Sequence, residues 1–433
     1  MATTTVTTVE PETKFASPIL PKSNHSLSAP PDEADDDVVR PDIEWIPSHK
    51  TYAKRVEQLK LNCMGRQTTI PEGWPEKLDA ARVWSGSDFK DDMRKCILQF
   101  EESDIAEIEN GLAHFKGLPH NNDPDNVNTE TFPLPTLGAK LNNVSKQIHD
   151  GIGFAVLRGL DPKKYSPRDN ILLYVGITSY IAEVRGCQDY DGRMVVHIQD
   201  IREDVRDYAK RGPFSPYTSR AQPFHTDRCD ILSLYAYDVS PTGGESVIAS
   251  GGKIYNEIAD KRPDIVHLLA DDKWIFDEFH NGDYHRRPLL HKFGSHGPGF
   301  VYSRRPLTGA WFSPHHPSVP AMSEEQAEAL DAVHFTAEKH QLELRLQRGD
   351  IELLNNFALF HARREFVDDP SARRHMIRLW LRNKDYAWES PEVVARSGRE
   401  IYDPNSPFRA NPVWDINWSP PLGRGPWKRM ECN

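Results

Sequence analysis

The sequence lacks the features that define several large classes of protein. None of its apolar runs is long enough to cross a bilayer, so we expect no transmembrane helix. Basic residues are outnumbered, with 53 Lys and Arg against 64 Asp and Glu, and the net charge of -11 disfavours a nucleic-acid-binding protein. Cysteines are few: the chain holds five, scattered and without a C-x-x-C pair, which disfavours both a zinc ribbon and a disulfide framework.

The N-terminal segment also lacks the features of a targeting signal. The start, MATTTVTTVEPETK, has no apolar stretch, and it carries Glu10 and Glu12 where a transit peptide would carry arginine. We therefore expect an intracellular, cytoplasmic protein. Residues 1–44 are rich in Thr, Pro, Ser and Asp and include the acidic run DEADDD. Such a composition buries too little apolar surface to offset its ordering entropy, so we predict a disordered acidic tail.

The 433 residues suffice for one large domain or two ordinary ones. Residues 45–150 are predicted to form a helical N-terminal layer that packs on the core. Within it, the spacing of apolar residues predicts helices over 88–117 and 137–148. A short buried strand is predicted at 153–157, followed by a helix over 166–184.

From about residue 194 the chain changes to short β-prone runs separated by Gly, Pro and Asp turns. These runs are RMVVHI, DILSLYAY, ESVIAS, KWIF, GFVYS, LELRL, DIELLN and MIRLWL, and one helix over 324–340 interrupts them. Many closely spaced strands without βαβ alternation favour a β-sandwich or barrel over a doubly wound fold. We predict one domain over 151–402. The Pro- and Trp-rich extension over 403–433 is expected to wrap back onto it.

One segment could hold a metal ion. His225-Thr226-Asp227 precedes an apolar strand, and residues i and i+2 of an extended chain face the same side. His225 and Asp227 can therefore offer a nitrogen and an oxygen to one ion. Because an H-x-[DE] match is common by chance, a lone pair of this kind is more often an ordinary hydrogen-bonded pair, and the context has to decide.

Three later segments supply that context. The first is the turn TGGES (242–246), and the second is GDIELLNNFALFHARREF, which carries His361. In the third, Arg374, Met376 and Arg378 share strand parity. An arginine in a half-buried strand needs an anionic partner, because an unpaired buried charge costs several kcal/mol. That partner could be a ligand or simply an acidic residue of the chain.

The order HTD, GGES, GD…NN…H and RR…R resembles the taurine dioxygenase / clavaminate synthase-like family of Fe(II)- and 2-oxoglutarate-dependent oxygenases over about residues 151–383. The resemblance implies an α+β fold with a double-stranded β-helix (jelly-roll) core. It implies that His225, Asp227 and His361 bind iron, that Arg374 binds the distal carboxylate of 2-oxoglutarate, and that Arg378 faces the substrate.

The same resemblance implies a reaction in which O₂ is consumed and succinate and CO₂ are released. Related halogenases lack the carboxylate ligand, so Asp227 favours hydroxylation, desaturation, cyclisation or oxidative cleavage. Two imidazoles and one carboxylate suit Fe(II) and leave coordination positions open for ligands. One position departs from the family, which often has a Thr after the GG turn that helps to bind 2-oxoglutarate. We take Ala249 as its counterpart, and Ser250 is the candidate replacement, although strand parity points it the other way.

We therefore expect a dioxygenase that oxidises a small metabolite, with no nucleic-acid or membrane partner. A substrate-facing Arg378 would favour an anionic substrate, because a guanidinium binds carboxylate or sulfonate through two hydrogen bonds. Two other functions stay open. A metal-dependent hydrolase or cofactor-free dioxygenase on the same jelly roll would give Arg374 no role, and a non-catalytic binding module would hold no Fe(II).

Overall fold

A computed structural model describes residues 43–61, 66–119, 123–189, 191–200, 217–277, 282–309 and 315–417. All of them belong to one compact unit that spans residues 38–433. The predicted acidic tail over 1–44 lies almost wholly outside the described residues, and so does the end of the C-terminal extension. No helix in the described ranges is long and apolar enough to span a membrane.

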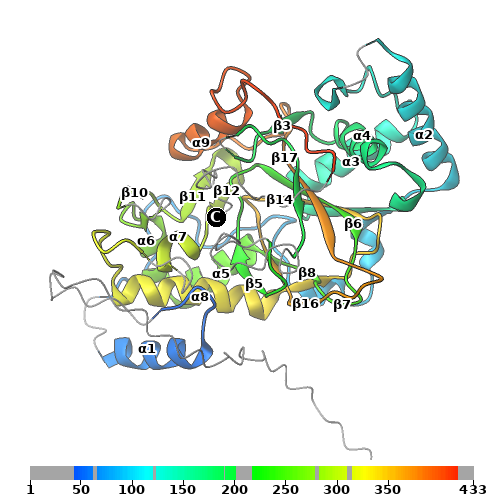
Figure 1. Ribbon diagram of the computed structural model, residues 1–433. Helices are drawn as coiled ribbons and strands as arrows, with labels where there is room; N and C mark the ends of the chain where they lie inside the picture. The colour runs from blue at the N-terminus through cyan, green and yellow to red at the C-terminus, as the bar shows by residue number, and fades with distance from the viewer. Residues whose placement is uncertain are drawn as a thin grey trace, which may run out of the picture. The chain divides into compact units, whose positions relative to one another are not determined.

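The larger of two main sheets has the strand order β1-β2-β14-β6-β17-β3, and β4 also pairs with β17. Its strands are β1 Ile97–Gln99, β2 Phe154–Arg158, β3 Val184–Gly186, β4 Val196–Ile198, β6 Ile231–Asp238, β14 Ile351–Asn355 and β17 His375–Arg382. Only β1 and β2 run parallel, and the other pairs are antiparallel. The central strands β14, β6 and β17 are far apart in sequence and lie side by side (Figure 1).

The smaller main sheet has the order β13-β8-β15-β5. Its strands are β5 Gln222–His225, β8 Ser246–Ser250, β13 Leu342–Leu344 and β15 Leu359–Arg363. Three two-stranded sheets accompany it, namely β7 Thr242–Gly243 with β16 Phe366–Val367, β9 Ile275–Phe276 with β10 His285–Arg286, and β11 Leu290–Phe293 with β12 Gly297–Phe300.

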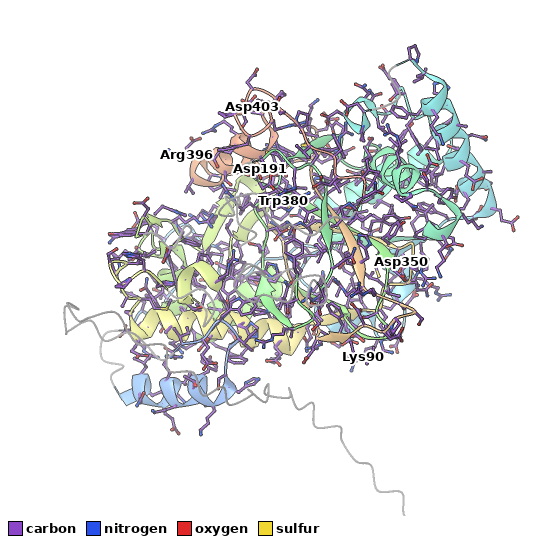
Figure 2. The ribbon with its side chains drawn as sticks, in the orientation of Figure 1. Lys90, Asp191, Asp350, Trp380, Arg396 and Asp403 are labelled. Atoms are coloured by element: carbon purple, nitrogen blue, oxygen red, sulfur yellow. The ribbon has the colours of Figure 1, made fainter. Side chains whose placement is uncertain are left out.

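The two main sheets share one apolar interior. Leu232 and Leu234 of β6 and Trp380 of β17 belong to the same buried cluster as Ile248 of β8. Trp380 is fully buried and lies inside the molecule in Figure 2. Because side chains alternate between the faces of a strand, the opposite face of the larger sheet is free to pack against helices. The mixed helix-and-sheet architecture with a jelly-roll core confirms the predicted fold class.

Helices cover the outer sides of both sheets (Figure 1). Helices α2 Glu102–Gly117, α3 Leu137–His149 and α4 Pro167–Thr178 pack on the larger sheet, in a second buried cluster. Helix α8 Glu324–His340 contacts β5 and β8 of the smaller sheet, and α1 His49–Leu61, α5 Gly251–Lys261 and α6 Pro263–Ala270 pack against α8. Within residues 45–150, α2 and α3 thus pack on the larger sheet whereas α1 packs on α8, and the proposed domain boundaries stay predictions. Short α7 Arg305–Thr308 and the later α9 Glu392–Tyr402 complete the set of described α-helices.

Several predicted elements agree with the structure and two do not. The helix over 324–340 is confirmed, and its start is fixed by a capping box between Ser323 and Gln326. The prediction of one helix over 88–117 is wrong in its first half, because residues 97–99 form β1 beside β2 and α2 begins only at Glu102. The helix over 166–184 ends early, at Thr178.

The described part of the C-terminal extension does contact the core. The backbone amide of Met194 donates to the carbonyl of Val413 at 2.9 Å, and Trp414 packs against the buried clusters. Arg193 and Asp415 form an ion pair at 3.0 Å. Residues 413–415 therefore support the segment that leads into β4.

Candidate metal centre and cosubstrate pocket

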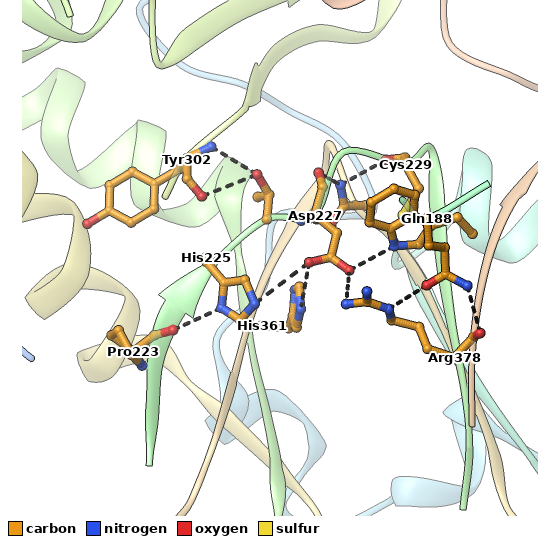
Figure 3. A network of polar contacts seen from close by, with 11 residues as sticks. Gln188, Pro223, His225, Asp227, Cys229, Tyr302, His361 and Arg378 are labelled. Carbon is orange, nitrogen blue, oxygen red and sulfur yellow. Dashed lines mark hydrogen bonds and ion pairs between the residues drawn. The ribbon is translucent and has the colours of Figure 1, made fainter. Parts of the chain in front are cut away.

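The two predicted histidine ligands face each other across a pair of strands. His225 ends β5 and is directly opposite His361 on β15 in the antiparallel register, and their ring centroids are 4.0 Å apart. Asp227 follows in the loop after β5. Its Oδ1 lies 3.8 Å from Nε2 of His225 and 3.9 Å from Nε2 of His361 (Figure 3). One ligand atom from each of the three residues lies within 4.8 Å of the others.

The backbone around Asp227 is held by residues from distant segments. The amide of Asp227 donates to Oδ1 of Asn356 at 2.8 Å, and Nδ2 of Asn356 donates to the carbonyls of Asp227 and Cys229. On the other side, the amide of Thr226 donates to the carbonyl of Tyr302 at 2.8 Å. The second Asn of the NN motif thus fixes the loop that carries the carboxylate.

The two oxygens of the Asp227 carboxylate have different surroundings. Oδ2 accepts hydrogen bonds from Nη1 of Arg378 and Nε1 of Trp380, both at 2.9 Å. Oδ1 is buried and has no hydrogen-bond partner among the described residues. Burial alone would raise the pKa of Asp227, but the charge of Arg378, the two histidines and the Trp380 hydrogen bond outweigh it and lower this pKa. The carboxylate is therefore ionised, with one oxygen left for a cation.

The histidines are arranged as neutral ligands. Burial lowers the pKa values of both His225 and His361, so both imidazoles are uncharged near neutral pH. The carbonyl of Pro223 lies 3.0 Å from Nδ1 of His225, which places the proton on that nitrogen and leaves Nε2 as the donor atom. The side chains of His225 and His361 keep 15% and 12% exposure, and both line a pocket.

These residues fit a divalent transition metal. Buried polar atoms in proteins almost always have a partner, so an unpartnered, ionised Oδ1 between two neutral imidazoles fits a cation ligand. Two histidines and one carboxylate are the donor set of non-haem Fe(II) oxygenases. No other group of three or more such side chains could hold a metal ion within the described ranges.

The pocket beside the triad lies between the two main sheets. The residues that line it are Trp45, Ile198, Gln222, Pro223, His225, Leu232, Leu234, Ser246, Ser303, Arg304, Arg305, His361, Ala362, Arg363, Arg374, Met376 and Arg378. Five of them are arginines, and among the described lining residues none is acidic. The pocket is therefore suited to anions.

Arg374 lines this pocket, and the GG turn makes room for it. Its Nε donates to the carbonyl of Gly244 at 3.3 Å, and its guanidinium lies over the ring of Phe366 at 5.5 Å. Gly244 has φ +77°, and a Cβ there would lie 2.9 Å from Cδ of Arg374. Burial lowers the pKa of Arg374 to about 10, which still leaves the group charged at neutral pH.

Arg378 also lines the pocket, but its described contacts are with other protein groups. Besides Asp227, its Nε donates to Oε1 of Gln188 at 2.7 Å (Figure 3). Gln188 in turn donates to the backbone carbonyl of Arg378 at 2.9 Å. The substrate role inferred for Arg378 from the sequence stays a prediction beside this observed contact with Asp227.

Ser246 lines the pocket although the sequence did not single it out, whereas Ser250, the predicted replacement for the family's Thr, lies outside the described lining. Ser250, the candidate replacement for the family's Thr, caps α5 through the amide of Lys253 and donates to the carbonyl of Arg82 at 2.5 Å. Neither Ser250 nor Ala249 is among the described lining residues. The serine hydroxyls among the lining residues belong to Ser246, two residues after Gly244, and to Ser303. Ser246 is the last residue of the TGGES turn, and its closeness to the glycine pair is the signal that could have located it.

Comparison with known proteins identifies a family and two relatives that are similar to this chain. The model of the family "Taurine catabolism dioxygenase TauD, TfdA family" matches residues 115–380. "Taurine hydroxylase-like protein SAT17" from Stachybotrys chartarum is 35% identical over 337 residues, which cover 75% of this chain and 85% of that protein. "FR-33289 synthase" from Streptomyces rubellomurinus is 23% identical over 285 residues, 59% of this chain and 76% of that protein.

Solved structures share the fold. Asparagine oxygenase in complex with Fe(II), 3-hydroxyasparagine and succinate has a TM-score of 0.52 and 16% identity, over 66% of this chain and 93% of its own. Non-heme iron oxygenase OrfP in complex with Fe and alpha-ketoglutaric acid has a TM-score of 0.50 and 17% identity, over 67% of this chain and 94% of its own. The family match and the SAT17 relative each cover well over half of the chain. The chain therefore belongs to the taurine catabolism dioxygenase TauD, TfdA family and is a non-haem Fe(II)- and 2-oxoglutarate-dependent dioxygenase.

Proposed function

We propose that this dioxygenase oxidises a small anionic metabolite, with Fe(II) bound by His225, Asp227 and His361. The observation that carries this assignment is the carboxylate of Asp227, whose Oδ2 is held by the protein while Oδ1 faces two neutral imidazoles. When bound, the iron supplies O₂ activation coupled to the oxidative decarboxylation of 2-oxoglutarate. The protein contributes the position of the ligands and the pocket beside them.

Arg374 and Ser246 are the proposed anchor for the distal carboxylate of 2-oxoglutarate. Both line the pocket that also contains His225 and His361, and the guanidinium provides the planar donor pair that a carboxylate accepts. The Ser246 hydroxyl adds a neutral donor. Non-heme iron oxygenase OrfP, solved with Fe and alpha-ketoglutaric acid, shares the fold and supports a cosubstrate in this pocket.

The substrate is proposed to be anionic because of the arginines on the metal side of the pocket. Arg305, at the start of α7, is buried and close enough to His225 for its charge to lower the pKa of that histidine. Trp45 offers an aromatic surface in the same pocket. An oxidisable small molecule with a carboxylate, sulfonate or phosphonate group fits this lining, and the ionised Asp227 ligand favours hydroxylation, desaturation, cyclisation or oxidative cleavage over halogenation.

The direct test is the conversion of 2-oxoglutarate to succinate by the purified protein with Fe(II) and O₂. We expect Arg374→Ala to abolish succinate formation while Fe(II) binding is kept, because the arginine contacts the cosubstrate and not the metal. Arg373→Ala is the matched control, since its neighbouring side chain is not among the lining residues. Turnover without any need for 2-oxoglutarate would point to the hydrolase or cofactor-free alternative, and protein unable to bind Fe(II) would point to a binding module.

A screen of small anions, read out by succinate release above the uncoupled rate, tests the substrate class. We expect Arg305→Gln to raise the KM for the substrate by about tenfold, the value of one charge-assisted hydrogen bond, without changing the affinity for Fe(II). Stimulation by neutral or cationic compounds alone would contradict an anionic substrate.

A further inference from the structure

A buried glutamate lies in the wall of the cosubstrate pocket. Glu352 on β14 is opposite Leu234 on β6, which is opposite Arg378 on β17. Side chains directly opposite in antiparallel pairs share a face of the sheet, so all three point toward the interior. Leu234 and Arg378 line the pocket, whereas Glu352 is 0% exposed.

Glu352 contacts one half of the proposed cosubstrate anchor. Oγ of Ser246 donates to Oε1 of Glu352 at 2.7 Å, so this hydroxyl is used by the protein itself. Oε2 of Glu352 is buried and has no hydrogen-bond partner within the described part of the chain. Glu352 therefore stands directly behind the surface that Ser246 and Arg374 present to the pocket.

The elements packed around Glu352 contribute few charges. The partners on β2 and β6, Val156 and Leu234, are apolar, and β8 contributes Ser246. The charged and titratable groups nearby are Arg374 and Arg378 from the β17 segment, Arg363 from β15, Asp350 from the turn before β14 and Tyr174 from α4. Arg378 is bonded to Asp227 and Asp350 to Arg158, so Arg374 is the cation whose charge acts on Glu352.

Burial raises the pKa of Glu352 to about 7, against the opposing effects of Ser246 and Arg374. An ionised Glu352 would neutralise the charge of Arg374 and repel an incoming carboxylate in a site of low dielectric. A protonated Glu352 leaves the full charge of Arg374 available. It also no longer needs the Ser246 hydroxyl as a donor, so that hydroxyl is released to the ligand.

We propose that Glu352 couples the binding of 2-oxoglutarate to the uptake of one proton, so that the cosubstrate pocket carries a net positive charge when the distal carboxylate binds. This inference rests on the proposed role of Arg374 and Ser246 as the anchor. Glu352 acts through these two residues and is a positioning residue, not a catalytic one.

The direction of the pH dependence follows from linkage. The bound dianion favours protonated Glu352, so the pKa of Glu352 is higher in the complex than in the free protein. Affinity is then highest at a pH below the free-protein pKa and falls as the pH rises through it. With that pKa at about 7, the Kd of the wild-type protein should increase by about tenfold between pH 6 and pH 8.

The experiment titrates 2-oxoglutarate into the Fe(II)-loaded full chain in the absence of O₂. Isothermal titration calorimetry measures the Kd and the binding enthalpy at several pH values. Two buffers of different ionisation enthalpy give the number of protons taken up. The wild-type protein should take up about one proton per 2-oxoglutarate at pH 8 and almost none at pH 6. Glu352→Gln, which mimics the neutral acid, should bind with a Kd that is nearly independent of pH. Glu343→Gln, at an exposed acid on β13, should keep the wild-type pH dependence.

Ligand chemistry provides a second control that needs no variant. The monoacid 2-oxopentanoate lacks the distal carboxylate, so its weaker binding should show neither the tenfold pH dependence nor the proton uptake. If Glu352→Gln does not fold, the comparison of the two ligands on the wild-type protein still tests whether proton uptake depends on the distal carboxylate. Binding of 2-oxoglutarate without proton uptake, or an equal pH dependence in wild type and Glu352→Gln, overturns the inference but leaves the proposed function intact. No binding of 2-oxoglutarate at any pH would overturn the proposed function, and this inference with it.

Discussion

At the scale of single residues, the contact between Arg378 and Asp227 makes a prediction about iron affinity. Arg378→Met removes one of the two donors to Oδ2, so that only Trp380 still orients the carboxylate. We expect about 10- to 100-fold weaker Fe(II) binding, the usual effect of losing a partner that orients a metal ligand. Competition with a chelator measures this affinity. Arg382→Met on the same strand, where the ion pair with Asp230 is longer at 3.6 Å, is the control.

The same variant separates two roles for Arg378. If the arginine faces the substrate, as the family resemblance implies, Arg378→Met will raise the KM for substrate and leave the Fe(II) affinity unchanged. An unchanged metal affinity would therefore contradict the positioning role that the contacts support.

The sequence could indicate which residues lie close together where the signal was local or shared with a family. His225 and Asp227 are two positions apart, and the motif order located His361. The structure brings their ligand atoms together as that order suggested, although their roles as iron ligands stay predictions. Gln188 and Glu352 carried no signal, because their contacts depend on pairings across strands far apart in sequence.

At the scale of elements, the glycine turn between β7 and β8 is predicted to set the position of Arg374. Gly244→Ala would place a Cβ 2.9 Å from Cδ of Arg374 and would force a φ of +77° on an L side chain. We expect the Kd for 2-oxoglutarate to increase by about tenfold or more, since a misplaced guanidinium loses a charge-assisted hydrogen bond. Anaerobic titration measures it.

The control for this turn is Gly117→Ala at the end of α2, where a Cβ would meet no atom within 4 Å. It should bind 2-oxoglutarate like the wild type. Equal affinities of Gly244→Ala and the wild type would show that Arg374 is not held by this turn, or does not bind the cosubstrate.

The spacing of apolar residues along the sequence predicts some helix and strand boundaries and misses others. The helical spacing of Ile105, Ile108 and Leu112 is real, and these residues face the cluster on the outer side of the larger sheet. Ile97 matches the same spacing but forms β1, because the exposed edge of β2 offers backbone partners to residues 97–99. Helix α5 was missed because its apolar residues directly follow a strand, and only the Ser250 cap marks the change.

At the scale of the whole molecule, buried histidines are predicted to control stability in mild acid. Burial lowers the pKa values of five histidines that are not proposed metal ligands, and the pKa is about 4 for His291 and about 3 for His375; the others are His149, His197 and His334. In the unfolded chain each binds a proton below about pH 6.5. The unfolded state then holds more protons than the folded state, so the free energy of unfolding falls as the pH falls below that value.

Two buried acids act in the opposite direction over the same pH range. Burial raises the pKa of Glu352 to about 7 and that of Asp230 to about 6, so the stability that they contribute is lost as the pH rises through these values. Below pH 5.5 both acids are protonated in the folded state but ionised in the unfolded chain, so they oppose the effect of the histidines. Five histidines outnumber two acids, so these residues together predict a free energy of unfolding that falls as the pH falls from neutral to 5. Below pH 5.5 the free energy of unfolding should fall by more than about 1.4 kcal/mol per pH unit.

Urea unfolding of the metal-free protein at a series of pH values between 5 and 8 measures this profile. His375→Asn should reduce the acid slope by about 1.4 kcal/mol per pH unit, the contribution of one proton, because Asn can keep a hydrogen bond to His197 but cannot titrate. Chelation of the metal beforehand is necessary, since bound Fe(II) would add its own pH-dependent binding free energy to the stability of the folded state. A stability that keeps rising from pH 6 to pH 5 would contradict the neutral, buried state of these side chains.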